Sequence, residues 1–167
     1  NEKENIPNIL LEVKKLIQIE NNYDFELLLM NNNSNDGSDI IAKEELKSFK
    51  DFRYIKLSRN FGYQANIKAG YDHCTGEAAV QLDADGEDDP KIISELLREW
   101  EKGFDVILAQ KETTKDNFFV RITKKIFYKF IKLISEVPLM LNTTGAGLFD
   151  RKIIEQVRTI DDPYPYF

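Results

Sequence analysis

Two aspartates follow directly after an apolar segment near the middle of the chain, in the run Leu82-Asp83-Ala84-Asp85. Residues 78–82 have the composition of a buried strand, so we expect both carboxylates at the point where that strand ends. Carboxylates this close together repel one another unless a cation or water lies between them. Two carboxylates that share one hard divalent ion leave its other positions to water and substrate phosphates. The spacing therefore predicts a site for a divalent cation and a phosphorylated ligand.

Three further acids follow, and for two of them a structural explanation is simpler. Glu87, Asp88 and Asp89 precede Pro90, which opens a helical pattern. Acidic side chains in the first turn of a helix stabilise its N-terminus through the helix dipole. We assign that role to Asp88 and Asp89. Asp83 and Asp85 are different, because acids at the end of a buried strand need a ligand to explain them.

The composition of the chain excludes several classes of protein. Its 167 residues are 42% hydrophobic, which is enough material for one domain with its own core. A formal net charge of −6 argues against nucleic-acid binding, because that function needs a basic surface. The single cysteine, Cys74, excludes a disulfide framework, and the single histidine, His73, lies in no motif. The sequence has no run of 18 apolar residues, so we expect none of these residues to cross a membrane.

Helices and strands are predicted to alternate along the first two thirds of the chain, from the spacing of apolar residues and the positions of turn formers. The expected helices cover about 6–17, 38–49, 63–74 and 91–102, and the expected strands 25–30, 54–57, 78–82 and 104–109. Short connections between alternating elements predict an α/β fold, with a mostly parallel sheet and helices on both faces. The polar loops 31–38, 58–62 and 83–89 should then meet at one edge of the sheet.

A basic helix is expected farther along, over residues 118–135. Residues 115–135 hold six basic side chains against one acidic side chain, although the chain as a whole is acidic. Helical spacing places Arg121, Lys125 and Lys129 on one side. A solvated face and a surface for anionic lipid or a lipid phosphate explain this stripe equally well. Beyond it, residues 142–151 should form a glycine-rich turn, a short strand and the start of a helix.

Four motifs resemble, in order and spacing, those of the inverting family 2 glycosyltransferases, which have the GT-A fold. Residues 1–7 resemble the family's Y-N-E-x-x-N-I-P without its tyrosine, and residues 30–38 stand where the family has V-N-D-G-S-x-D-G-T. Residues 57–62 are similar to L-S-R-N-F-G, and residues 82–85 to M-D-A-D. The resemblance covers nearly the whole chain. The most similar branch looks like that of dolichyl-phosphate mannose synthase and the bacterial polyprenyl-phosphate sugar transferases.

The resemblance implies transfer of a sugar from a nucleoside diphosphate sugar, with Mg²⁺ or Mn²⁺ on the diphosphate. By the same resemblance Asp85 is the main metal ligand, Asp83 serves the ribose or sugar side of the donor, and Glu87 is a further candidate ligand. Such a metal neutralises the charge that develops on the leaving diphosphate. The other candidates for donor binding are Asn31, Asn32, Ser34 and Asp36 for base and ribose, Arg59 and Asn60 for the diphosphate, and Ala84 between the two aspartates.

The chain departs from the family pattern at three places. Asn32 replaces an aspartate, so recognition of a base could persist by hydrogen bonds but without the charge, and Glu87 stands where many relatives have glutamine. The family's frequent G-D-F is absent, and residues 144–147 offer no carboxylate. A sugar hydroxyl as acceptor would need a base, for which Asp88 remains a candidate, whereas a lipid phosphate is already ionised and needs none. We therefore expect a polyprenyl phosphate acceptor at the cytoplasmic face of a membrane, with a glycan acceptor as the alternative.

Two other functions stay open. A sugar-1-phosphate nucleotidyltransferase shares the nucleotide, the metal and the α/β topology, and a non-catalytic nucleotide- or lipid-binding domain is suggested by Asn32 and the missing base. The resemblance also implies that the single domain 1–167 is truncated at both ends. The family's first, central strand would precede Asn1, and the family continues past Phe167. Strands 25–30 and 78–82 should then border an empty strand position.

A membrane role for the basic stripe can be tested with lipid vesicles. Each Lys or Arg near an anionic surface contributes on the order of 1 kcal/mol, so about four or five of them would hold a domain weakly. We expect co-sedimentation with anionic vesicles that falls with added salt and with the double change Lys125→Glu/Lys129→Glu. Equal binding to neutral vesicles, or binding to neither kind, would leave the stripe as ordinary solvated surface.

Overall fold

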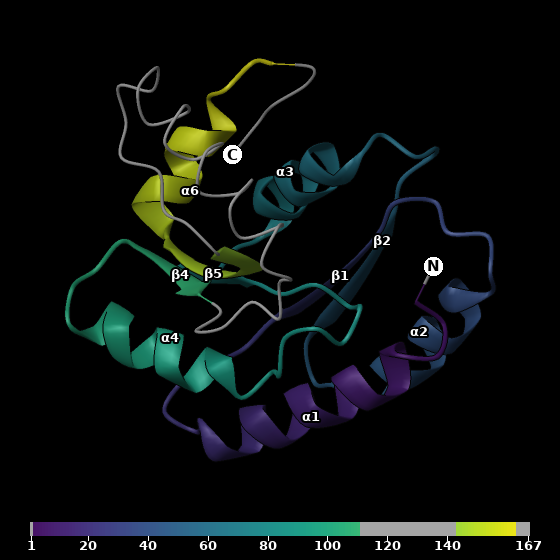
Figure 1. The fold of residues 1–167 in the computed structure, drawn as a ribbon, viewed down its shortest axis with the longest axis horizontal. Coiled ribbons are helices and arrows are strands. Elements are labelled where there is room, and N and C mark those ends of the chain that lie inside the picture. Colours follow the sequence, from purple (N-terminus) through teal and green to yellow (C-terminus); the bar gives the residue numbers. More distant parts are fainter. Residues whose placement is uncertain (1, 111–142, 163–167) are drawn as a thin grey trace, which may run out of the picture.

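The computed structural model describes residues 2–110 and 143–162, and its elements alternate as predicted (Figure 1). The helices are α1 (Ile6–Ile19), α2 (Ser38–Leu46), α3 (Tyr63–His73), α4 (Ile92–Glu101) and α6 (Arg151–Arg158), and the strands are β1 (Leu27–Asn31), β2 (Phe52–Lys56), β3 (Ala78–Gln81), β4 (Val106–Gln110) and β5 (Thr143–Asp150). The expected basic helix, with Arg121, Lys125 and Lys129, lies outside the described residues. Within those residues, every helix is too short or too polar to cross a bilayer.

The described strands form two sheets instead of one. β1 and β2 pair in parallel, from Leu27 opposite Phe52 to Asn31 opposite Lys56. β5 lies between β3 and β4 and is antiparallel to both. The expectation of a mostly parallel sheet is therefore right for β1 and β2 but wrong for the sheet that contains β5. The reason is that Thr143 at the start of β5 pairs with Gln110 at the end of β4, so β5 runs back along its neighbour.

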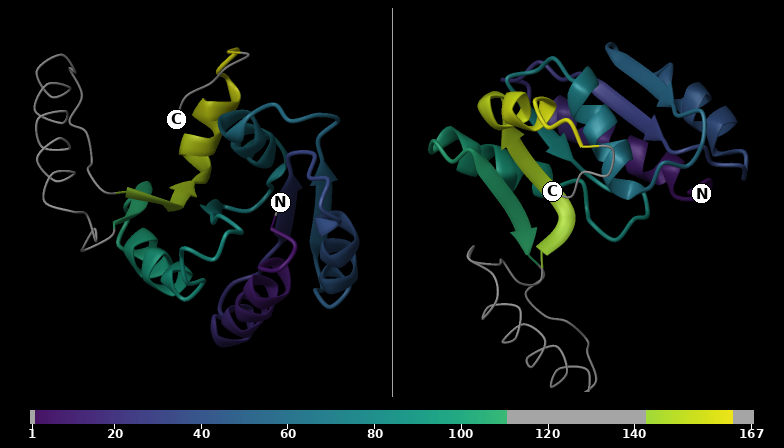
Figure 2. Two further views of the ribbon diagram at one scale, coloured as in Figure 1. Left: turned by 45° about the vertical axis from the view of Figure 1, so that its right-hand side comes forward. Right: turned by 90° about the horizontal axis from the view of Figure 1, so that it is seen from above.

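Helices cover both faces of these sheets, as predicted, with α1, α2 and α4 on one face and α3 and α6 on the other (Figure 1, Figure 2). Leu27 and Leu29 of β1 pack against buried residues of α1 and α2. The residue between them, Leu28, packs on the other face with Tyr71 of α3 and Ile154 of α6. β1 is therefore covered on both faces, which explains its uninterrupted apolar sequence.

One edge of β1 and one edge of β3 have no ladder partner among the described residues. β1 pairs on its other side with β2, and β3 pairs on its other side with β5. The two strands do not bond to each other, which agrees with the expectation that they border an empty position. The same small cluster of apolar side chains nevertheless contains Leu28 of β1 and Ala79 of β3. The sheets are therefore joined by side chains and by the helices that cover them.

α2 begins where it was predicted but ends earlier. Gly37, with a φ of 87°, is the N-cap and has no side chain to cap the helix, and Ser38 is the first helical residue. The carboxylate of Asp36 accepts instead from the backbone N–H of Ser38. The helix ends at Leu46 instead of residue 49, because the next three N–H groups bond to carbonyls only three residues back.

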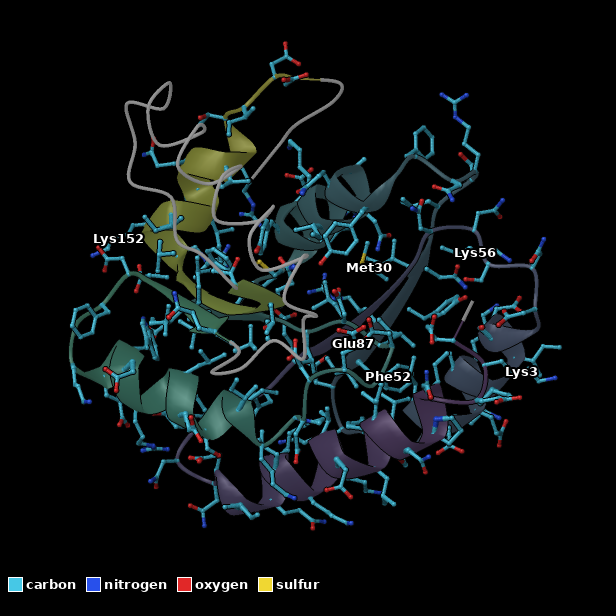
Figure 3. All side chains as sticks on the ribbon, in the orientation of Figure 1. Lys3, Met30, Phe52, Lys56, Glu87 and Lys152 are labelled. Atoms are coloured by element: carbon cyan, nitrogen blue, oxygen red, sulfur yellow. The ribbon has the colours of Figure 1, made fainter. Side chains whose placement is uncertain are left out.

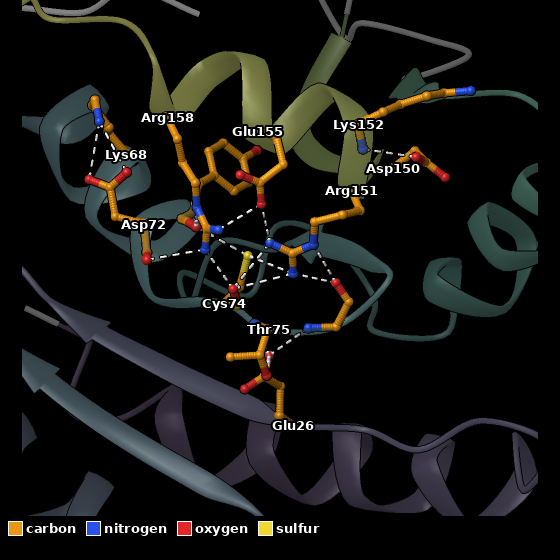
Figure 4. Close-up of polar contacts among 12 residues, drawn as sticks. Glu26, Lys68, Asp72, Cys74, Thr75, Asp150, Arg151, Lys152, Glu155 and Arg158 are labelled. Atoms are coloured by element: carbon orange, nitrogen blue, oxygen red, sulfur yellow. Dashed lines mark hydrogen bonds and ion pairs between the residues drawn. The ribbon is translucent and has the colours of Figure 1, made fainter.

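A carboxylate joins the two sheets at the amino ends of β1 and β3 (Figure 4). Glu26 accepts the backbone N–H of Thr75, its hydroxyl at 2.9 Å and the N–H of Gly76 at 3.0 Å. It also pairs with Arg53 of β2. From the other side, Arg151 of α6 donates to the Gly76 carbonyl at 2.8 Å. The backbone N–H groups of this loop before β3 thus bond to Glu26, and its Gly76 carbonyl bonds to Arg151.

The Glu26 contacts predict a pH-dependent contribution to stability. Burial alone would raise the pKa of Glu26, but the bonds from Thr75, Arg53 and Gly76 lower it below the ordinary 4.5. The contribution is therefore complete above pH 4.5 and is lost as the pH falls through the lower folded value. We expect Glu26→Gln to lower the free energy of unfolding in urea by about 1–2 kcal/mol at neutral pH. The difference from the unchanged protein should shrink in acid.

The matched control for this measurement is Glu44→Gln. Within residues 2–110 and 143–162, Glu44 forms an ion pair only with Lys47, one turn away on an exposed surface, so its loss should change stability by less than about 0.5 kcal/mol. An effect of Glu26→Gln that is equal at neutral and acid pH would show that the carboxylate charge is not what joins the sheets.

Candidate functional site

The three polar loops meet at one edge of the fold, as predicted. They follow the carboxyl ends of β1, β2 and β3, and the start of β5 lies beside the third loop. Side-chain hydrogen bonds link the first loop to the second and the second to the third. Asn32 donates to Asn60, and Tyr63, directly after the second loop, donates to Asp83. The residues before α1 close the group, because Asn5 donates to the carbonyl of Asp85 at 2.9 Å. This edge brings all candidate residues of the three loops into one region.

The loop after β1 is shaped by its own side chains. Asn31 is buried, donates to the hydroxyl of Tyr54 at 2.7 Å and accepts the N–H of Ser34 at 2.6 Å. The carboxylate of Asp36 accepts from Ser38 and from the backbone N–H of Lys3 at 3.2 Å. The hydroxyl of Ser38 is the main reason that the pKa of Asp36 falls to about 2.

Two lysines border the same loop, and both are labelled in Figure 3. Lys56, at the end of β2, lies 3.5 Å from the carbonyl of Ser34 and 3.6 Å from the carboxylate of Asp39. Lys3 contributes its backbone N–H to Asp36. The loop that we assigned to base and ribose is therefore held in shape by hydrogen bonds within the protein.

The amide of Asn32 connects the first loop to the second. Its Nδ2 donates to Oδ1 of Asn60 and to the carbonyl of Gly62, both at 3.0 Å. Its Oδ1 accepts the N–H of Phe61 at 2.9 Å. An aspartate could not make the two donated bonds, so the family's acid at this place does not suit this loop. Arg59 lies over the ring of Phe61, with its guanidinium carbon 4.6 Å from the ring centroid.

The carboxylate of Asp83 is half-buried against α3 and β5. The hydroxyl of Tyr63, the first residue of α3, lies 3.0 and 2.9 Å from its two oxygens. Burial raises the pKa of Asp83, the bond from Tyr63 opposes this, and the charges of Asp85, Asp88 and Glu87 add to the rise. These acids are therefore close enough to repel one another.

The other acids of the loop lie in a tight turn. Oδ1 of Asp85 accepts the N–H of Glu87 at 2.9 Å, and Gly86 between them has a φ of 78°. Both acidic side chains are exposed, and Glu87 is labelled in Figure 3. Asp89 accepts the N–H of Lys91 at 3.0 Å, and this bond is the main cause of its lowered pKa. Asp89 therefore bonds a backbone N–H just before α4, but the acidic residue in the first turn of α4 is Glu95, so the predicted first-turn role of Asp88 and Asp89 is wrong.

The residues of this loop fit a divalent cation that is only partly enclosed. Among the described residues, no lysine or arginine forms an ion pair with Asp83, Asp85 or Asp88, whereas Lys91 pairs with Asp89. The described part of the chain also has no group of three or more His, Cys, Asp or Glu side chains that could hold a metal. A cation here would take one or two carboxylates and complete its shell with water and phosphate oxygens.

Three site residues were missed from the sequence. Tyr63 gave no signal, because an aromatic residue at the start of a helix is more often part of the core. Gln81 was detectable as a polar residue inside an apolar strand. Gly145 lies in β5, where we predicted a turn and noted only the lack of a carboxylate. A side chain there would place its Cβ 2.2 Å from an oxygen of Asp83, so the two residues are in direct contact.

Comparison with known proteins adds independent information. The family model described as Glycosyl transferase family 2 matches residues 1–158. YkcC of Bacillus subtilis, named an uncharacterized glycosyltransferase, is 33% identical over 150 residues, which are 89% of this chain and 46% of YkcC. The glycosyltransferase sll0501 of Synechocystis is 30% identical over 166 residues, or 97% of this chain and 51% of that protein.

A third relative carries a more specific name. The prophage bactoprenol glucosyl transferase homolog of Escherichia coli is 28% identical over 163 residues, which are 97% of this chain and 53% of that protein. The chain thus spans about half the length of the curated relatives it matches.

The contacts of Asn32 predict that this chain needs an amide where the family pattern has an acid. Asn32→Asp keeps an acceptor for Phe61 but loses both donated bonds and sets a charge against the oxygens of Asn60 and Gly62. We expect the free energy of unfolding in urea to fall by about 1–3 kcal/mol. Asn33→Asp is the control, since it adds the same charge at an exposed position whose φ of 63° aspartate tolerates. Equal losses in both variants would contradict the role of the amide.

Proposed function

Because this chain belongs to the family 2 glycosyltransferases, we propose that it forms the donor-binding part of an enzyme that transfers a sugar from a nucleoside diphosphate sugar to a polyprenyl phosphate. The observation that carries the proposal is the meeting of Asp83 and Asp85 with the loops of Asn32 and Arg59 at one edge. The bactoprenol glucosyl transferases among the relatives support the lipid phosphate acceptor.

The acidic loop holds the metal-bearing end of the donor in this proposal. Asp85 is exposed at the tip of its turn and serves as the main ligand for Mg²⁺ or Mn²⁺, with Glu87 beside it as a further ligand. Asp83 lies deeper, next to Tyr63, and accepts hydrogen bonds from the ribose or sugar side. When bound, the cation supplies the positive charge that offsets the charge on the leaving diphosphate.

The two loops after β1 and β2 hold the nucleotide. Base and ribose lie along Asn31, Asn32, Ser34 and Asp36, and the diphosphate lies near Arg59, Asn60 and Ala84. The guanidinium of Arg59 is exposed, and its contact with the ring of Phe61 limits its freedom. A restrained arginine binds phosphate oxygens at a smaller cost in conformational entropy than a free one.

A lipid phosphate suits this site as acceptor because it brings its own negative charge. Its oxygen attacks the anomeric carbon directly, the bond to the donor diphosphate breaks, and a single displacement inverts the configuration. No proton has to be removed, which fits the lack of a carboxylate on residues 144–147. For a hydroxyl acceptor, Asp88 would be the candidate base. Arg121, Lys125 and Lys129 remain a proposed contact with the membrane surface.

We also propose that the GT-A fold of the family is completed here by a strand between β1 and β3. The support is the pair of strand edges without a ladder partner among the described residues. Two buried side-chain oxygens on α3, those of Gln64 and Asn66, also have no hydrogen-bond partner there. Unpaired backbone and amide groups are costly, so a peptide segment that supplies donors would stabilise this region.

The metal role of Asp85 predicts the behaviour of a single variant. Asp85→Asn should leave the fold intact, because the side chain is exposed in a loop, but should raise the dissociation constant for a UDP- or GDP-sugar with Mn²⁺ by more than about tenfold. Calorimetric titration of the full-length protein measures this. Asp89→Asn is the control, because its amide oxygen can still accept from Lys91. Unchanged affinity in Asp85→Asn would remove this residue from the donor site.

A further inference from the structure

The hydroxyl of Tyr63 is the contact that orients Asp83. It lies 3.0 and 2.9 Å from the two carboxylate oxygens and has one proton to donate. The bond joins two different elements, because Tyr63 begins α3 and Asp83 follows β3. A hydrogen bond to an ionised carboxylate is stronger than one between neutral groups. Tyr63 can therefore fix the direction in which Asp83 points.

Gln81 determines which way the Tyr63 hydroxyl points. Its Nε2 lies 2.9 Å from the carbonyl of Gly145, which can only accept, and 3.2 Å from the hydroxyl of Tyr63. The amide is held from its other end, since Tyr71 donates to its Oε1 at 3.0 Å. Because the hydroxyl of Tyr63 accepts from Gln81, its own proton is available for Asp83.

Gly145 provides the space beside the carboxylate and the Tyr63 hydroxyl. A Cβ on this residue would lie 2.2 Å from Oδ2 of Asp83 and 3.1 Å from the hydroxyl of Tyr63. No side chain fits there while Asp83 keeps this orientation. The carboxylate thus lies against both the Tyr63 hydroxyl and the bare backbone of β5.

We propose that Tyr63, oriented by Gln81, is a positioning residue that sets the Asp83 carboxylate for donor binding, and that Gly145 is required to leave room for it. The role of the positioned carboxylate rests on the proposed function, whereas the coupling between Tyr63 and Asp83 is a property of the protein alone. The arrangement also gives a reason for the absence of a side chain at position 145, where Asp83 already fills the space.

A double-mutant cycle in the full-length protein tests the proposal. The donor is the UDP- or GDP-sugar that the unchanged protein binds with Mn²⁺, and the variants are Tyr63→Phe, Asp83→Ala and the two together. Tyr63→Phe keeps the ring and removes only the hydroxyl, and Asp83→Ala removes both acceptor oxygens. Tyr63→Phe should raise the dissociation constant about tenfold, but less than about twofold when residue 83 is already alanine. In turnover, the donor KM should rise while kcat changes less than about threefold.

Two further variants complete the design. Tyr23→Phe is the matched control, because it also loses a bond from a tyrosine hydroxyl to a carboxylate, that of Glu101, but away from the site; donor affinity should not change. Gly145→Ala should weaken donor binding and, with the carboxylate displaced, should abolish the effect of Tyr63→Phe. An equal effect of Tyr63→Phe in all backgrounds, or no effect in any, would overturn the proposal.

A ligand-free measurement separates this inference from the proposed function. In thermal unfolding without donor, Tyr63→Phe should lower Tm in the unchanged background and leave it unaltered in the Asp83→Ala background. If the protein binds no nucleotide sugar, the proposed function fails, and this coupling alone decides whether Tyr63 positions Asp83. Additive shifts in Tm would overturn the coupling.

Discussion

Side chains determine how the two sheets lie relative to each other, because no backbone hydrogen bond joins β1 to β3 within the described residues. At the amino ends of these strands, Glu26 holds the loop before β3. In the middle, Leu28 and Ala79 share one apolar cluster under α3 and α6. At the carboxyl ends, the bond from Tyr63 to Asp83 completes the connection. The edge where the loops after β1, β2 and β3 meet spans both sheets. Its geometry therefore depends on the same contacts that hold the sheets together.

The two halves of that edge differ in the charge that they carry. The loops after β1 and β2 satisfy their polar groups internally, through Asn31, Asn32 and Asp36. The acidic loop also forms internal hydrogen bonds, but it gathers negative charge, and burial and the neighbouring acids raise the pKa of Asp83. A divalent cation would therefore supply the positive charge that the acidic loop and the donor diphosphate both lack. This difference explains why we expect donor binding to depend on a divalent cation.

The sequence predicted the order of the elements and the edge where the polar loops meet, because apolar periodicity and strand-end motifs are local signals. The antiparallel insertion of β5 was not predictable in this way, since it depends on the pairing of Thr143 with Gln110 across a long separation. The use of Asn32 was also hidden, because its partners lie about 30 residues away in the loop after β2. The contact between Gly145 and Asp83 depends on the pairing of β5 with β3, so no local pattern could show it.

We propose that the whole protein transfers one sugar to a polyprenyl phosphate. The most direct test is the mass of the lipid product after incubation of the full-length protein with polyprenyl phosphate, Mn²⁺ and a set of UDP- and GDP-sugars. The account predicts a lipid that is heavier by a single sugar residue and still has its single phosphate, with release of the nucleoside diphosphate. A lipid product with a second phosphate, or no lipid product from any donor that the protein binds, would contradict it.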